Sequence, residues 1–178
     1  MNVRNYKCAG VLILGLSTLW IGPLEAAGLI GIDNAGHVIG LNTSTGAGTL
    51  IGASGVPGPS SLASSPDGTF YTVGSDLHLY TINPATGAGT IGPALSGLGA
   101  TFFLNGLAFS ESGVLYADAL VGSSNTSLFT INKTTGVATL VGQISPDSIT
   151  DIAFSPSGTL YAWGRRDHKW RSDDRGHR

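Results

Sequence analysis

The feature that most constrains the fold of this chain is an internal repeat with a period of 45 residues. One motif occurs three times: LASSPDGTFYT (62–72), LAFSESGVLYA (107–117) and IAFSPSGTLYA (152–162). The turn glycines of these copies, Gly68, Gly113 and Gly158, are 45 residues apart in both intervals. A fixed period of this length means that one supersecondary unit is built several times along the chain.

A second motif alternates with the first. Its copies are VIGLNTSTGAGTL (38–50), LYTINPATGAGTI (79–91) and LFTINKTTGVATL (128–140). The shared Asn-x-x-Thr-Gly core is typical of a tight turn, because Asn forms an Asx-turn and Gly takes a left-handed conformation. Apolar and polar residues alternate before the turn, which favours a strand. The motif therefore predicts a β-hairpin in each repeat.

The two motifs together predict an all-β fold of propeller type. Gly and Thr are plentiful and only 11% of the residues are charged, which favours strands over helices. A repeat near 45 residues without a helical pattern is the length of one four-stranded propeller blade. Counting strands a to d, the first repeat starts at strand b (29–33), two repeats are complete, and the fourth ends after strand b (159–163). This gives 13 strands and an incomplete β-propeller.

The repeats also resemble a known class of proteins. LYTINPATGAGTIG (79–92) and LAFSESGVLYA (107–117) are similar to the repeats of secreted bacterial β-propeller proteins, and more distantly to quinoprotein, NHL and WD-type blades. The resemblance covers about residues 28–164. It implies blade architecture, and binding at the cell surface or in the periplasm more often than catalysis. It implies no functional residue, because the matched motifs are turns and strands.

Residues 1–27 have the pattern of a signal peptide. Arg4 and Lys7 precede an apolar stretch over 8–22, and small residues allow cleavage after Ala26 or Ala27. The alternative is a membrane anchor, but the apolar stretch is shorter than the ~20 residues that a span needs. We therefore expect a secreted or periplasmic protein without a stable membrane anchor. Cys8 is the only cysteine, so the mature domain has no disulfide.

Charge divides the rest of the chain into two parts. Residues 28–164 hold one basic side chain, Lys133, and seven acidic ones, a net charge of 1 − 7 = −6. Residues 165–178 hold six Lys or Arg and three Asp, a net charge of +3. The acidic body excludes a nucleic-acid partner. The abrupt change predicts that 165–178 is a disordered tail or is not native to the propeller; a natural basic tail is the alternative.

Motifs for cofactors and nucleophiles give no site. Gly87–Gly92 matches G-x-G-x-x-G, but a dinucleotide site needs that motif between a strand and a helix, and here the repeat predicts a hairpin. No G-x-S-x-G, H-E-x-x-H or D-x-D-x-D-G motif occurs. The sequence therefore predicts no catalytic and no cofactor-binding residue, and no cofactor.

Potential metal ligands are also too few. Asp33 and Asp118 each follow a turn glycine by five residues, so they are expected at equivalent positions where carboxylates could hold Ca²⁺. Val73 and Trp163 occupy that position in the other repeats, so no ring of acids forms. His37 and His78 are expected at non-equivalent surface positions. In the tail, Asp167, His168, Asp174 and His177 are expected to be charged or polar side chains exposed to solvent. The sequence predicts no metal site.

The function predicted from these observations is a propeller-type binding or scaffold protein for an unknown protein or carbohydrate ligand. One alternative is a fragment of a propeller enzyme of hydrolase, lyase or quinoprotein type. The other is a truncated gene product without independent function. Open blade edges predict a homo-oligomer. If strand a of the fourth repeat completes the first repeat, two chains supply six blades. Seven apolar residues are expected to be buried between blades: Leu107, Phe109, Leu115, Ile131, Ile152, Phe154 and Leu160.

Overall fold

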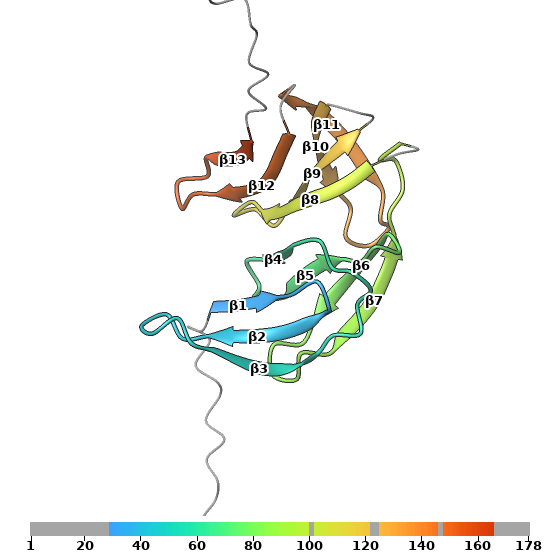
Figure 1. Ribbon diagram of the computed structural model, residues 1–178. Helices are drawn as coiled ribbons and strands as arrows, with labels where there is room; N and C mark the ends of the chain where they lie inside the picture. The colour runs from blue at the N-terminus through green and yellow to red at the C-terminus, as the bar shows by residue number, and fades with distance from the viewer. Residues whose placement is uncertain (1–28, 100–101, 122–124, 146–147, 166–178) are drawn as a thin grey trace, which may run out of the picture.

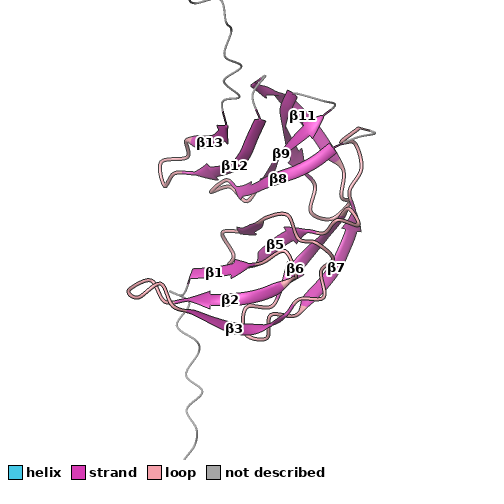
Figure 2. Ribbon diagram, in the orientation of Figure 1, coloured by secondary structure: helices cyan, strands magenta, loops and turns pink. Residues whose placement is uncertain are grey.

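The computed structural model describes residues 29–99, 102–121, 125–145 and 148–165. Over these residues the chain consists of strands and loops, as Figure 2 shows. No helix in the described ranges is long and apolar enough to cross a membrane. The predicted signal peptide (1–27) and the tail beyond residue 165 lie outside the described residues.

The described strands form four antiparallel sheets, which we call blades 1 to 4. Blade 1 contains β1 (Leu29–Ile32), β2 (His37–Leu41) and β3 (Gly48–Ala53). Blade 2 contains β4 (Leu62–Ser64), β5 (Phe70–Val73), β6 (His78–Ile82) and β7 (Gly89–Ala94). Blade 3 contains β8 (Phe102–Phe109), β9 (Leu115–Val121), β10 (Asn125–Ile131) and β11 (Ala138–Ser145). Blade 4 contains β12 (Ser148–Phe154) and β13 (Leu160–Arg165).

The all-β fold, the 13 strands and the incomplete propeller predicted from the repeat are confirmed. The blades follow one another in an arc, with β4, β8 and β12 on its inner side and β3, β7 and β11 on its outer side (Figure 1). One expectation is wrong. The described pairings join β12 to β13 and join β1 to β2 alone, so the fourth repeat does not complete blade 1. Each chain thus contributes four separate sheets.

The Asn-x-x-Thr-Gly turns form as predicted. The side-chain oxygen of Asn42 accepts hydrogen bonds from the backbone N–H groups of Ser44 and Thr45 at 2.9 and 3.0 Å. Asn83 and Asn132 make the same pair of bonds in blades 2 and 3. These Asx-turns fix the register of the outer hairpins.

Apolar clusters fill each junction between neighbouring blades. The junction of blades 2 and 3 holds the largest cluster, to which both sheets and the linker residues Leu95 and Leu98 contribute. Four of the seven predicted core residues are buried: Leu107, Leu115, Ile131 and Ile152. Phe109, Phe154 and Leu160 are only partly buried. The expectation for these three was wrong because the two phenylalanines end the inner strands beside a cavity, and Leu160 lies in a sheet of only two strands.

Candidate functional site

Three copies of one hairpin turn meet at one end of the inner strands. They connect β4 to β5, β8 to β9, and β12 to β13. In each copy a glycine N–H donates to a serine carbonyl at 2.9 Å: Gly68 to Ser65, Gly113 to Ser110 and Gly158 to Ser155. The three glycines have φ between 80° and 85°, and a Cβ would meet nothing within 4 Å. Glycine is therefore required by the backbone conformation and not by crowding.

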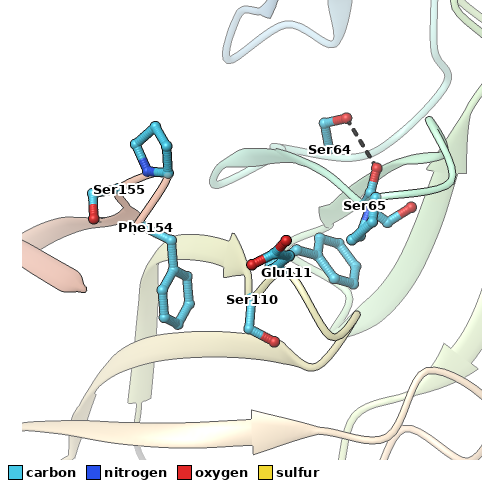
Figure 3. A pocket seen from close by; sticks show the side chains of 9 residues that line it. Ser64, Ser65, Ser110, Glu111, Phe154 and Ser155 are labelled. Atoms are coloured by element: carbon cyan, nitrogen blue, oxygen red, sulfur yellow. Dashed lines mark hydrogen bonds between the residues drawn. The ribbon is translucent and has the colours of Figure 1, made fainter. Parts of the chain in front are cut away.

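These turns line an open depression of about 410 Å³, which we call the turn pocket. Each turn contributes three consecutive residues to its lining: Ser64, Ser65 and Pro66; Phe109, Ser110 and Glu111; and Phe154, Ser155 and Pro156. Figure 3 shows the labelled residues of the three turns around one opening, with Glu111 between the turns of blades 2 and 4. Residues 45 positions apart in the sequence thus form a single lining.

Aromatic pairs support the apolar side of the turn pocket. The ring of Phe109 lies 5.2 Å from that of Tyr71 on the preceding blade, and Phe154 lies 5.3 Å from Tyr116 in the same way. The Nζ of Lys133 lies 5.2 Å from the centre of the Phe109 ring, within the range of a cation–π interaction. The one basic residue of the acidic body is therefore held beside the pocket.

Most polar groups of the turns are occupied by the turns themselves. The Ser65 hydroxyl donates to the Asp67 carboxylate, and this bond, with the N–H of Thr69, lowers the pKa of Asp67 to about 2. Asp67 is therefore ionised at neutral pH. Glu111 is exposed and faces the cavity, so its carboxylate is available to accept hydrogen bonds from a ligand.

The two histidines of the repeat region, His37 and His78, are not among the residues that line the turn pocket. His37 Nδ1 is 2.9 Å from an oxygen of Asp33, and His78 Nδ1 is 3.4 Å from an oxygen of Asp76. Each is the first residue of strand c in its blade, so the expectation that they occupy non-equivalent positions is wrong. Each pairs with an acid of its own turn. No group of three or more His, Cys, Asp or Glu that could hold a metal occurs among the described residues.

The expected equivalence of Asp33 and Asp118 is also wrong. Asp118 pairs with Leu128 in blade 3, and in blade 1 it is Ile32 that makes the corresponding pair, with Val38. In the sequence Ile32 follows Gly28 by four residues, whereas Asp118 follows Gly113 by five, so counting from the glycine misses the equivalent residue by one. Asp33 instead accepts hydrogen bonds from Ala35 and His37 in the turn after β1. The two acids are therefore not brought together.

Asp118 lies in a different polar cluster, between blades 3 and 4. Its side chain is fully buried, accepts a hydrogen bond from the N–H of Gly106 at 2.8 Å, and lies near the amide of Asn105. Burial, together with the neighbouring charge of Asp151, outweighs these hydrogen bonds and raises the pKa of Asp118 to about 6. The cluster holds the inner strands β8 and β12 together, since Asn105 also donates to the carbonyl of Ile149 at 2.8 Å.

The G-x-G-x-x-G match behaves as the repeat predicts. Gly87 lies in the Asn-x-x-Thr-Gly turn and Gly89 begins β7, so a strand follows the motif. The turn pocket itself was not predicted. Phe109 and Phe154 were expected in the core, and the serine and proline residues of the lining in connecting turns. The available signal was that these residues occupy equivalent positions of successive repeats.

Comparisons with known proteins give the fold. No family model matches the chain, and no curated protein matches it. A solved structure of a protein from Lactobacillus plantarum matches with a TM-score of 0.54 and 20% identity, over 80% of this chain and 46% of that one. A putative gluconolactonase matches with a TM-score of 0.52 and 17% identity, over 78% and 54%.

A third similar structure is the PQQ-bound aldose sugar dehydrogenase of Streptomyces coelicolor, with a TM-score of 0.48 and 19% identity, over 77% of this chain and 42% of that one. The chain thus spans about half the length of these solved proteins. The likeness shows a propeller fold, as the sequence repeats predicted.

Proposed function

We propose that this protein is a propeller-type binding module and that the turn pocket takes a neutral carbohydrate. The observation that carries the proposal is the convergence of three equivalent turns on one cavity. Binding sites are typically concave, with apolar walls and a few polar groups that orient the ligand. The turn pocket has both.

The chemistry of the lining favours a sugar. The rings of Phe109 and Phe154 offer faces on which the C–H groups of a pyranose can stack, and Glu111 offers an acceptor for its hydroxyls. The net charge of −6 over residues 28–164 disfavours an anionic ligand. A neutral oligosaccharide satisfies these conditions better than a nucleotide or an acidic polymer.

Titration with cellobiose, maltose and chitobiose, followed by calorimetry and by NMR, tests the proposal. Glu111→Ala removes the exposed acceptor and is expected to weaken binding about tenfold, since a hydrogen bond to a charged group contributes about 1.5–3 kcal/mol. Phe154→Ala is expected to weaken it as well. Asp33→Asn, in a turn of blade 1, is the matched control and should bind as the wild type does. Absence of binding by every sugar, or equal affinities for all three variants, would refute the proposal.

The second candidate is a fragment of a propeller enzyme. It rests on the similarity of the fold to one solved structure of a putative gluconolactonase. Turnover of glucono-lactone by the purified chain would favour this candidate over simple binding.

The proposal includes export from the cytoplasm, to the periplasm or the medium. It rests on the basic start, apolar stretch and small residues of positions 1–27. The intact mass of the exported chain should correspond to cleavage after Ala26 or Ala27. A full-length chain in the membrane fraction would support the anchor instead.

A further inference from the structure

The two ends of the arc of blades carry faces that are covered everywhere else in the molecule. Each blade has a forward face, toward the next blade, and a backward face, toward the preceding one. The forward face of blade 3 presents Tyr116 to Phe154 of blade 4, as that of blade 2 presents Tyr71 to Phe109. The junctions of blades 2 and 3 and of blades 3 and 4 therefore share one aromatic pair.

The forward face of blade 4 has no such partner among the described residues. Tyr161, the counterpart of Tyr116, is 63% exposed. Trp163 is 76% exposed, although its counterpart Asp118 is fully buried. Ala153 is exposed where Ala108 is buried. An exposed Tyr–Trp pair on a regular strand is the signature of an interaction surface.

The backward face of blade 1 is also exposed. Leu29 is 57% exposed, whereas Leu115, at the same position of blade 3, is 1% exposed. Ile39 and Leu41 are partly exposed, and their counterparts Phe129 and Ile131 are buried. The face presents these three aliphatic side chains, with the His37–Asp33 pair at one end of β2.

We propose that the forward face of blade 4 docks on the backward face of blade 1 of a second copy of this chain. At each internal junction the forward face of one blade is buried against the backward face of the next, and these two faces are exposed counterparts of such a pair. Blade 1 lacks an inner strand, so Tyr161 and Trp163 would meet β1 and β2. The side chains that would meet are aromatic on one face and aliphatic on the other, so the contact buries apolar surface. The contact joins the face of one sheet to the face of another. A dimer formed in this way contains eight sheets, whereas the sequence analysis predicted a dimer of six blades. This inference is independent of the turn pocket.

Light scattering of the full chain at micromolar concentration tests the proposal. The wild type should have twice the mass of one chain. Tyr161→Asp and Leu29→Asp should each give the mass of a single chain with an unchanged circular dichroism spectrum, because both residues are exposed in the monomer. Leu140→Asp is the matched control: it is 60% exposed on β11, away from both faces, and should remain a dimer.

Cross-linking tests the arrangement. In a Cys8→Ser background the chain has no cysteine, so single Tyr161→Cys and Leu29→Cys proteins can be mixed and treated with a short bismaleimide. Cross-links between the two variants are expected, and few within either variant alone. A monomeric wild type, a dimer that tolerates both aspartates, same-variant cross-links, or a dimer that forms only when 166–178 is deleted would each overturn the proposal. The last result would show that the tail is the occupant.

Discussion

The junction of blades 2 and 3 and the junction of blades 3 and 4 have the same geometry and opposite chemistry. At the centre of the first lies Val73, packed with Ala117 and Leu115 in the main apolar cluster. The equivalent residue of the second is Asp118, which is buried with Asn105 and Asp151 beside it. One position of the repeat thus holds an aliphatic side chain in one blade and a carboxylate in the next.

The difference shows that the same strand pairing is compatible with different ways of stabilising the contact between two blades. The strand pairing of blade 3 needs only the alternation that places residue 118 on the forward face, and either side chain satisfies it. What changes is how the junction is stabilised at this position: by apolar burial in the first, and by hydrogen bonds to a buried acid, beside an apolar cluster, in the second. We therefore expect mutations to affect the two junctions differently.

The largest expected difference comes from deleting an equivalent leucine in each junction. Leu115 is fully buried between blades 2 and 3, and Leu160 is partly buried between blades 3 and 4. Leu115→Ala should lower the free energy of unfolding by about 3–4 kcal/mol, and Leu160→Ala by about 1–2 kcal/mol. Urea denaturation followed by circular dichroism measures both. Equal midpoints for the two variants would show that the junctions are equally packed.

The sequence predicted the blades and their order, because the turn motifs and the alternation are local signals. Gly68, Gly113 and Gly158 mark their hairpins wherever the blades lie in space. It did not predict what the repeats bring together. The turn pocket and the polar cluster around Asp118 depend on contacts between blades. A one-residue difference between the glycine and strand b was enough to misalign Asp33.

A smaller difference is expected from pH. Because burial raises the pKa of Asp118 to about 6, the folded chain keeps a proton that the unfolded chain releases near 3.8. The folded state therefore binds more protons between about pH 4 and 6, and its stability falls as the pH rises through this window. The loss amounts to about 2–3 kcal/mol for a shift of this size.

Asp118→Asn separates this contribution from those of other groups, since the amide keeps an acceptor for the N–H of Gly106. Urea midpoints at pH 4 and pH 7 should differ less in this variant than in the wild type. Asp33 and Asp67 do not interfere, because their pKa values are lowered and they titrate below the window. If the urea midpoint of Asp118→Asn changes with pH as much as that of the wild type, a group other than Asp118 causes the pH dependence.

The smallest effect is expected where the inner strands of blades 3 and 4 approach most closely. A Cβ at Gly106 would lie 2.4 Å from a carboxylate oxygen of Asp118 and 2.7 Å from the backbone nitrogen of Ile152. A backbone atom cannot rotate away as a side chain does, so Gly106→Ala must push β12 outward and is expected to cost about 1–3 kcal/mol.

Gly142→Ala is the control for this substitution, because a Cβ there meets nothing within 4 Å. Its effect on the free energy of unfolding should be within about 0.5 kcal/mol. The loss in Gly106→Ala should appear first as faster hydrogen exchange in β12 and β13, while β5 and β6 keep their protection, since only the polar junction is forced apart. Uniform loss of protection over all blades would instead show that the two junctions unfold as one unit, and that their different chemistry has no separate effect on stability.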